Sequence, residues 1–422
     1  MMTDSTGKQS MLRGLKEIIK KIVPSRLTSR WKRRMIENVN RRIANSEIAP
    51  YEKGCFERGI NLIGPIDAAT GLGQSTRLIE NMLETLGEKH CIVDFSLYTE
   101  NRIDIDSLVH LMQKTPVYDI NLWHVSPSEF AEAFSLMGRE AFDKHYNIAY
   151  WLWELEDFPD EWTVYSALLD EVWTPSEFVS ESIRKKVDIP VYTIPYDIKA
   201  PTDERYDRKY FSLPEDKFLC LMMYDNRSIA ERKNPEGAVK AYRKAKKDIL
   251  GPSALVIKVN SMDEVSRAKL NELVSGVDDV YITEMNLSKY EVNSFIKCCD
   301  VYISLHRAEG FGLVMAEAML NGVPVIATDW SANTEYMDSS SACLVDYDLV
   351  KLEDDLPPYR KGNVWADADT DAAAEYIVCL ANDSAFRSEI SENGKRKIME
   401  ALSSEKVNGL MAQRLKDICD GK

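Results

Sequence analysis

The feature that most constrains the fold is an alternation of short apolar runs with longer amphipathic stretches, which begins at Gly59 and continues through the 422 residues. This pattern indicates parallel strands joined by crossover helices. A helix is expected at Gln74–Leu86, with Gly87 at its C-terminus. The first series of expected strands is Ile60–Ile63, Ile92–Phe95, Ile120–His124, Ile148–Trp151, Glu171–Thr174 and Val191–Ile194.

A second α/β series follows the Pro-punctuated stretch 197–214. Two successive series predict two Rossmann-like domains that face each other across a cleft, with ligands bound outside the carboxyl ends of the strands. We place the N-terminal domain at 46–205 and the C-terminal domain at 206–402, after a basic arm at 1–45. The expected strands of the second series are Phe218–Met223, Leu255–Val259, Val280–Thr283, Val301–Leu305 and Val323–Ala327.

Charge is distributed unevenly. The chain has a net charge of −15, yet residues 8–42 carry twelve Lys/Arg and two Glu, so the remainder is strongly acidic. An acidic body disfavours nucleic acid as a partner, and only the arm could attract an anionic surface. Residues 12–22 have apolar side chains at helical spacing among lysines. Two interpretations stay open: a helix that lies on an anionic membrane, and a helix packed on its own domain or a solvated tail.

The cellular location of the protein is predicted from features that the sequence lacks. There is no apolar stretch of the length that a membrane span needs, and no apolar signal core at the N-terminus. None of the eight cysteines forms a CxxC pair, so we expect reduced core thiols. These features predict a cytoplasmic protein, with peripheral attachment to the inner face of the membrane if the arm binds lipid.

The most informative segment joins the expected strand at Leu305 to a helix that ends at Gly322. Its loop contains Glu309, Gly310 and Gly312, and Glu317 follows on the helix. Glycines let the backbone approach a ligand, and a helix N-terminus attracts an anion. Two carboxylates beside such a site suit the hydroxyls of a sugar and a ribose. The alternative is an ordinary strand–loop–helix unit with two exposed glutamates.

This segment resembles the Glu-x7-Glu motif of retaining glycosyltransferase family 4, with its Glu-Gly-Phe-Gly-Leu and Gly-x-Pro-Val-Ile-Ala-Thr surroundings. The resemblance implies a GT-B fold, a nucleoside-diphosphate sugar as donor, and a final helix at 403–419 that returns to the first domain. It also implies that Glu309 binds donor-sugar hydroxyls, that Glu317 binds the ribose, and that the amides of Phe311, Gly312 and Leu313 face the sugar and phosphates.

A second constellation follows the strand Phe218–Met223. Departure of a diphosphate without a metal requires fixed cations to stabilise the developing charge. The family resemblance implies an Arg and a Lys six residues apart after this strand, and Arg227 and Lys233 match that spacing. Taken alone, two basic loop residues are more often solvated than catalytic.

Three residues of the first domain are candidates through the same resemblance. Gly71 and Gly73 lie in a turn that is neither a Walker P-loop nor a complete dinucleotide fingerprint. The family often has a glycine-rich turn here, close to the donor phosphate and the acceptor. His124 ends an expected strand, where the family commonly has a histidine near the donor sugar, although a lone histidine there is usually structural.

We therefore predict a retaining, metal-independent glycosyltransferase that acts on a glycan or lipid-linked acceptor. An aromatic segment at 146–179 resembles family members associated with bacterial surface polysaccharides, and it receives no catalytic role. The Asp-x-Asp pairs lack supporting ligands, so neither a metal nor another cofactor is expected. Alternatives are an inactive nucleotide-sugar-binding partner, another GT-B enzyme such as a phosphorylase, and a dehydrogenase.

Overall fold

The computed structural model describes residues 25–96 and 102–421. The chain forms two compact units that are not two simple halves. Unit 1 contains the N-terminal part to Trp151, with Phe158–Trp173 and Arg184–Tyr192. Unit 2 contains Thr193–Lys422 and takes up two earlier segments, Leu152–Asp157 and Thr174–Ile183. The aromatic region of the sequence is therefore divided between both units.

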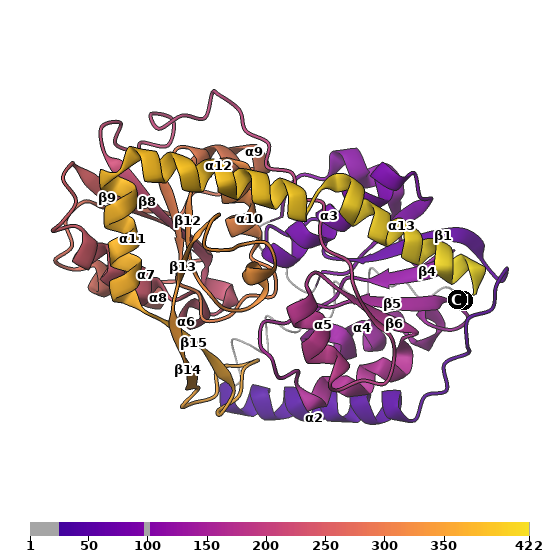
Figure 1. Ribbon diagram of the computed structural model, residues 1–422. Coiled ribbons are helices and arrows are strands. Elements are labelled where there is room, and N and C mark those ends of the chain that lie inside the picture. Colours follow the sequence, from indigo (N-terminus) through magenta and orange to yellow (C-terminus); the bar gives the residue numbers. More distant parts are fainter. Residues whose placement is uncertain (1–24, 97–101, 422) are drawn as a thin grey trace. The chain divides into compact units, whose positions relative to one another are not determined.

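The sheet of unit 1 has seven strands in the order β3-β2-β1-β4-β5-β6-β7. Four of them, β1, β4, β5 and β6, are labelled in Figure 1. All register pairs described from β3 to β6 are parallel. The order reverses between β1 and β4, so the loops after these two strands diverge at one point of the carboxyl edge. The strands are β1 (Glu57–Gly64), β2 (His90–Asp94), β3 (Met112–Gln113), β4 (Tyr118–Trp123), β5 (Tyr146–Tyr150), β6 (Glu171–Thr174) and β7 (Val191–Thr193).

The sheet of unit 2 has six parallel strands in the order β10-β9-β8-β11-β12-β13, and its order reverses between β8 and β11. The same unit contains a separate two-stranded antiparallel sheet, formed by the last two strands of the chain. The strands are β8 (Phe218–Asp225), β9 (Ser253–Asn260), β10 (Val280–Thr283), β11 (Val301–Ser304), β12 (Val325–Thr328), β13 (Cys343–Val345), β14 (Tyr347–Lys351) and β15 (Val364–Ala368).

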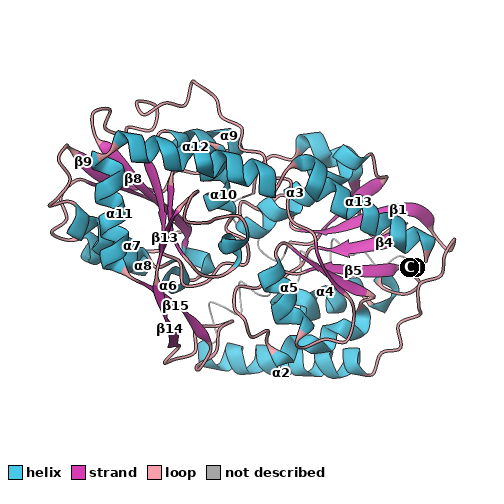
Figure 2. Ribbon diagram, in the orientation of Figure 1, coloured by secondary structure: helices cyan, strands magenta, loops and turns pink. Residues whose placement is uncertain are grey.

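Helices flank each sheet, as Figure 2 shows in cyan. Apolar side chains from helices and strands fill the space between them; Tyr242 of α7 and Ile377 of α11, for example, are buried in the core of unit 2. The α-helices are α2 (Ser25–Ala44), α3 (Gly71–Leu86), α4 (Phe130–Met137), α5 (Glu177–Arg184), α6 (Ala230–Lys233), α7 (Pro235–Ala245), α8 (Glu264–Val274), α9 (Lys289–Lys297), α10 (Leu313–Leu320), α11 (Thr370–Asn382), α12 (Ser384–Ala401) and α13 (Ser404–Asp420).

The C-terminal part of the basic arm is the helix α2, which packs against α4 and the 3-10 helix Asp160–Leu168 of unit 1. From Arg33 onward, where burial is described, Val39 and Ile43 are the buried side chains of this helix, whereas Arg33 and Arg41 are exposed. The amphipathic pattern at residues 12–22 lies outside the described residues. None of the helices in the described ranges has the length and apolar character needed to cross a membrane.

The fold class predicted from the sequence, two Rossmann-like α/β domains, is confirmed. The predicted helix N-terminal to Gly87 begins three residues earlier, at Gly71, because Thr70 caps it by accepting from Gly73 N–H. Gly87 has the predicted left-handed conformation, with a φ of 67°. The thiols are free, but Cys55 and Cys379 are exposed, so the prediction that all cysteines are core residues was wrong for these two.

Candidate active site

The order of strands in unit 2 brings two loops together at its switch point. One follows β8 and leads into the one-turn helix α6, and the other follows β11 and leads into α10. Two left-handed residues, Ile229 and Asn234, flank α6 with φ values of 62° and 54°. Asn234 then donates to the carbonyl of Leu305, which ties the end of α6 to the end of β11. The predicted residues Lys233 and Glu309 lie on these two loops.

Glu309 is the centre of a buried charge cluster. Lys233 Nζ donates directly to Glu309 Oε1, and Arg232 Nη1 lies 3.1 Å from the same oxygen. Burial favours the protonated form of Glu309, but Lys233 and Arg232 outweigh it and lower the pKa of Glu309 to about 2. Burial also lowers the pKa of Lys233, against the attraction of Glu309. Glu309 is therefore a carboxylate at neutral pH, held between two cations.

Arg232 connects this cluster to distant parts of unit 2. Its guanidinium is buried, donates to the carbonyl of Ala308 at 2.8 Å and lies 3.7 Å from Glu154. Glu154 also accepts a hydrogen bond of 3.0 Å from the hydroxyl of buried Tyr359. The charges of these four groups, Lys233, Arg232, Glu309 and Glu154, sum to zero, so each cation has a carboxylate partner.

The loop Glu309–Gly312 is fixed by contacts from several elements. Tyr336 donates its hydroxyl to the carbonyls of Phe311 and Gly312, at 2.8 and 3.0 Å. Ser176 donates to the carbonyl of Gly310 at 2.8 Å, and a Cβ at Gly310 would overlap the carbonyl oxygen of Trp153. Gly312 has a φ of 88° and precedes α10, a helix whose first N–H groups receive no side-chain cap. The loop is thus rigid on one side and offers uncapped amides on the other.

Substitution of Gly310 tests this close approach. Gly310→Ala is expected to destabilise unit 2 by about 1–3 kcal/mol, because the backbone of Trp153 cannot move aside as a flexible side chain would. Gly409→Ala is the control, since a Cβ there meets no atom within 4 Å, and it should leave stability unchanged or slightly raised. Urea unfolding followed by tryptophan fluorescence measures both; equal stability of the two variants would contradict the packing described.

The second predicted carboxylate, Glu317, is buried on α10 and forms an ion pair with Lys289 at the start of α9. Lys289 is positioned by the capping box of Ser288 and Glu291, in which both reciprocal hydrogen bonds are present. Glu317 and Glu309 are therefore both paired with a lysine. Any ribose bound at Glu317 would have Lys289 as a neighbour.

Arg227 lies apart from the cluster. Its guanidinium donates to Asp225, the last residue of β8, at 3.0 Å, and within the described ranges no hydrogen bond or ion pair joins it to Lys233 or Glu309. Buried Lys258 of β9 lies near the same aspartate and donates to Asn260. Burial lowers the pKa of Lys258 to about 8, although Asp225 opposes this shift.

Lys258 should therefore make stability depend on pH. Its pKa in the folded state is below the unfolded value of 10.5. Between about pH 8 and 10.5 the unfolded state therefore binds more protons than the folded state, and the free energy of unfolding rises with pH. Lys258→Met is expected to stabilise unit 2 by up to about 3 kcal/mol at pH 7 and by less at pH 9.5. Urea unfolding at both pH values measures the difference, with exposed Lys240→Met as control. A pH-independent difference would contradict the shift.

In unit 1 the structure brings three predicted residues to one switch point. Gly73 belongs to the first turn of α3, where a Cβ would overlap the carbonyl of Ala68, whereas Gly71 has open space around it. Ser75 of the next turn bonds Nε2 of His124 at 2.6 Å. His124 is fully buried and stacked on Tyr150, and burial lowers its pKa to about 3. His124 is thus neutral and its Nε2 has a partner.

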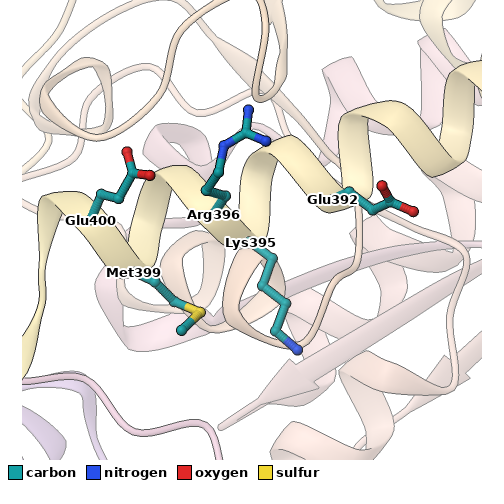
Figure 3. Close-up of a pocket in the computed structure, with 5 residues that line it drawn as sticks. All are labelled: Glu392, Lys395, Arg396, Met399 and Glu400. Carbon is teal, nitrogen blue, oxygen red and sulfur yellow. The ribbon is translucent and has the colours of Figure 1, made fainter.

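A surface hollow on unit 2 is lined by one helix (Figure 3). All five of its lining side chains belong to the single helix α12, and none is a predicted site residue: Glu392, Lys395, Arg396, Met399 and Glu400. Ligand sites usually combine an apolar wall with polar groups that converge from several elements. This hollow has no such convergence, so it adds nothing to the site.

Part of unit 2 matches a known family model. Residues 205–397 match the family model of the glycosyl transferases, group 1. This match spans both loops of the site, from β8 through α10 and into α12. No curated protein matches the chain.

Solved structures extend the relationship to the fold of the whole chain. HepE of Anabaena, in complex with UDP and glucose, superposes with a TM-score of 0.63 at 12% identity, over 85% of this chain and 100% of that one. Sucrose-phosphate synthase of Thermosynechococcus elongatus gives 0.64 at 16%, over 87% and 100%. A glycosyltransferase of Rickettsia africae gives 0.63 at 14%, with the same coverages. The chain therefore has the GT-B glycosyltransferase fold.

The sequence did not identify every polar residue of the segment that matches the family model. Arg232 was passed over in favour of its neighbour Lys233 because the resemblance supplied only one lysine at that spacing. Lys289 gave a signal in retrospect, because the capping box fixes where the first residue of α9 points. Tyr359 gave none, since it belongs to an irregular connection between β14 and β15.

Proposed function

We propose that this chain transfers a sugar from a nucleoside-diphosphate sugar to a glycan or lipid-linked acceptor, with retention of configuration and without a metal. The observation that carries the proposal is the Lys233–Glu309–Arg232 cluster beside the uncapped start of α10, within the segment that matches the group 1 family. HepE, a protein of similar fold, has been solved with UDP-glucose.

The charge pairs suggest how the donor would bind. A diphosphate carries more negative charge than the single carboxylate of Glu309, so it can draw Lys233 toward itself. Glu309 would then be released to accept hydrogen bonds from the sugar hydroxyls. Loss of one ion pair and gain of another keeps both buried cations compensated, which limits the cost of removing them from water.

The chemical step needs stabilisation of the leaving group more than it needs a base. As the bond between the anomeric carbon and the phosphate oxygen breaks, negative charge grows on the diphosphate, and Lys233 with the amides of Phe311, Gly312 and Leu313 would oppose that charge. The acceptor hydroxyl attacks the anomeric carbon on the same face, and its proton passes to the departing phosphate. Arg227 would act as a second cation if it exchanges Asp225 for phosphate.

The remaining roles follow from the same proposal. Glu317 would bind the ribose hydroxyls, and the turn at Gly71 and Gly73 would approach the donor phosphate and the acceptor. His124, which is buried and neutral, would contact the sugar only if its bond to Ser75 exchanges. Residues 8–42 would hold the enzyme near a membrane-borne acceptor in polysaccharide synthesis.

A transfer assay tests the proposal. The full chain is incubated, in EDTA, with UDP-, GDP- and ADP-linked sugars and with lipid-linked or free glycan acceptors, and both diphosphate release and labelled product are followed. We expect one donor to be consumed, with a product whose anomeric configuration matches the donor. Activity that returns only with added divalent ion would refute metal independence, and an inverted product would refute retention.

A further inference from the structure

A second cluster of ionisable groups lies in unit 1, at the end of its sheet opposite to the strand ends discussed above. Glu80 and Glu84 lie one turn apart on α3, and His90 is the first residue of β2, paired with Ile60 of β1. One ligand atom from each of the three side chains lies within 4.8 Å of the other two. Because His90 begins its strand, the cluster is at the amino edge of the sheet, away from Gly64 and His124.

One ring nitrogen of His90, Nδ1, has a hydrogen-bond partner, and the other, Nε2, has none. Nδ1 lies 2.8 Å from the carbonyl oxygen of Glu88, an acceptor only, so Nδ1 carries a proton. In the neutral ring Nε2 is then a lone pair, and it is buried, without a hydrogen-bond partner, 3.6 Å from Glu80 Oε1. Two electron-pair donors at this distance repel each other unless a proton or a metal ion lies between them. A histidine whose other nitrogen donates to a backbone carbonyl is the usual arrangement of a metal ligand.

The surroundings favour a cation. Among the described residues, neither lysine nor arginine forms an ion pair with Glu80 or Glu84; the neighbouring Lys89 pairs with Glu57 instead. The C-terminus of α3, which ends at Gly87, adds the negative end of a helix dipole. Glu84 is exposed, so an ion could enter from solvent.

We propose that Glu80, Glu84 and His90 bind a divalent transition-metal ion, best matched by zinc, that fastens the end of α3 to β2. Zinc takes nitrogen and carboxylate oxygen ligands at about 2.0–2.2 Å, which separates neighbouring ligands of a tetrahedron by roughly 3.4 Å. The observed 3.6 Å between His90 Nε2 and Glu80 Oε1 is close to that separation. Water would complete the coordination. The site is structural and takes no part in sugar transfer.

Zinc titration of the full chain tests this proposal. The metal-stripped protein is titrated with zinc sulfate by calorimetry, and retained zinc is counted after desalting. We expect one zinc per chain in the wild type, a higher Tm with zinc, and affinity at least about tenfold lower in Glu84→Gln, since even outer partners of a site contribute about 10–100-fold. Glu84 is exposed, so this variant should fold normally.

Controls separate this site from adventitious zinc. His110→Gln removes an exposed histidine and should bind zinc like the wild type. Cobalt in place of zinc should lack the intense near-ultraviolet thiolate band that binding to exposed Cys55 or Cys379 would give. Undiminished zinc binding by His90→Gln, or no zinc binding by the wild type, would overturn the proposal and leave His90 as a protonated partner of Glu80.

Discussion

Replacing Lys233 with alanine is expected to lower the turnover of sugar transfer by about 100- to 1,000-fold, the usual effect of removing one fixed group that stabilises a developing oxyanion. Lys233 is the cation that the structure places on Glu309, and in the proposed reaction it moves to the diphosphate. Nucleotide affinity should fall as well, because phosphate charge is present in the ground state. Steady-state release of nucleoside diphosphate measures the effect.

Lys240→Ala is the matched control for this experiment. Lys240 lies on α7, in the same unit, and its only described ion pair is with exposed Glu236. Its removal changes the net charge by the same amount and should leave turnover within about twofold, as expected for an exposed pair. Equal loss in both variants would show that Lys233 acts through general charge and not through contact with the donor.

Replacing Arg232 with methionine should have the largest effect on stability. The change leaves buried Glu309 with Lys233 alone and removes the cation from Glu154, and breaking a buried ion pair on one side costs about 3–5 kcal/mol. Urea unfolding of unit 2, followed by tryptophan fluorescence, measures the loss. A change below about 1 kcal/mol would mean that water already compensates these charges.

A double variant separates charge from packing. The single variant Arg232→Met leaves the Glu154 carboxylate without its cation, and adding Glu154→Gln removes that carboxylate. The double variant should therefore lose less stability than the sum of the losses of the two single variants. Arg232→Lys keeps a charge but cannot reach both Ala308 and Glu309 with a planar fork, and it should fall between the wild type and the methionine variant.

Two strands have the predicted bounds although their burial differs, since β6 is fully buried and β10 is a partly exposed edge strand. Glu171–Thr174 and Val280–Thr283 have the predicted bounds, and the other expected strands differ by one to three residues at their ends. β3, β13 and the β14–β15 pair were missed. β3 has two residues and β13 has three, and β14 is partly exposed, so none of them gives a long apolar run. Such strands form because a neighbouring strand supplies hydrogen bonds.

The sequence predicted those site residues that lie in a local pattern. Glu309, Phe311 and Gly312 lie in one local motif, and Lys233 follows a strand whose position the apolar pattern fixes. The link between Glu154 and Tyr359 joins residues 205 positions apart, so no local pattern predicts it. The partners of Glu309 were also unforeseen, because the resemblance assigns it to a sugar and does not say what holds it before the sugar arrives.

The most direct test of the account is calorimetric titration of the full chain, in EDTA, with UDP, GDP and ADP. We predict saturable binding of one of these nucleotides at one site per chain, lost or at least tenfold weaker in Lys233→Ala and unchanged in Lys240→Ala. EDTA in this experiment also removes any ion at Glu84 and His90, so Glu84→Gln should bind the nucleotide like the wild type. No binding of any of the three nucleotides, or equal binding by Lys233→Ala, would contradict a donor site built on Lys233 and Glu309.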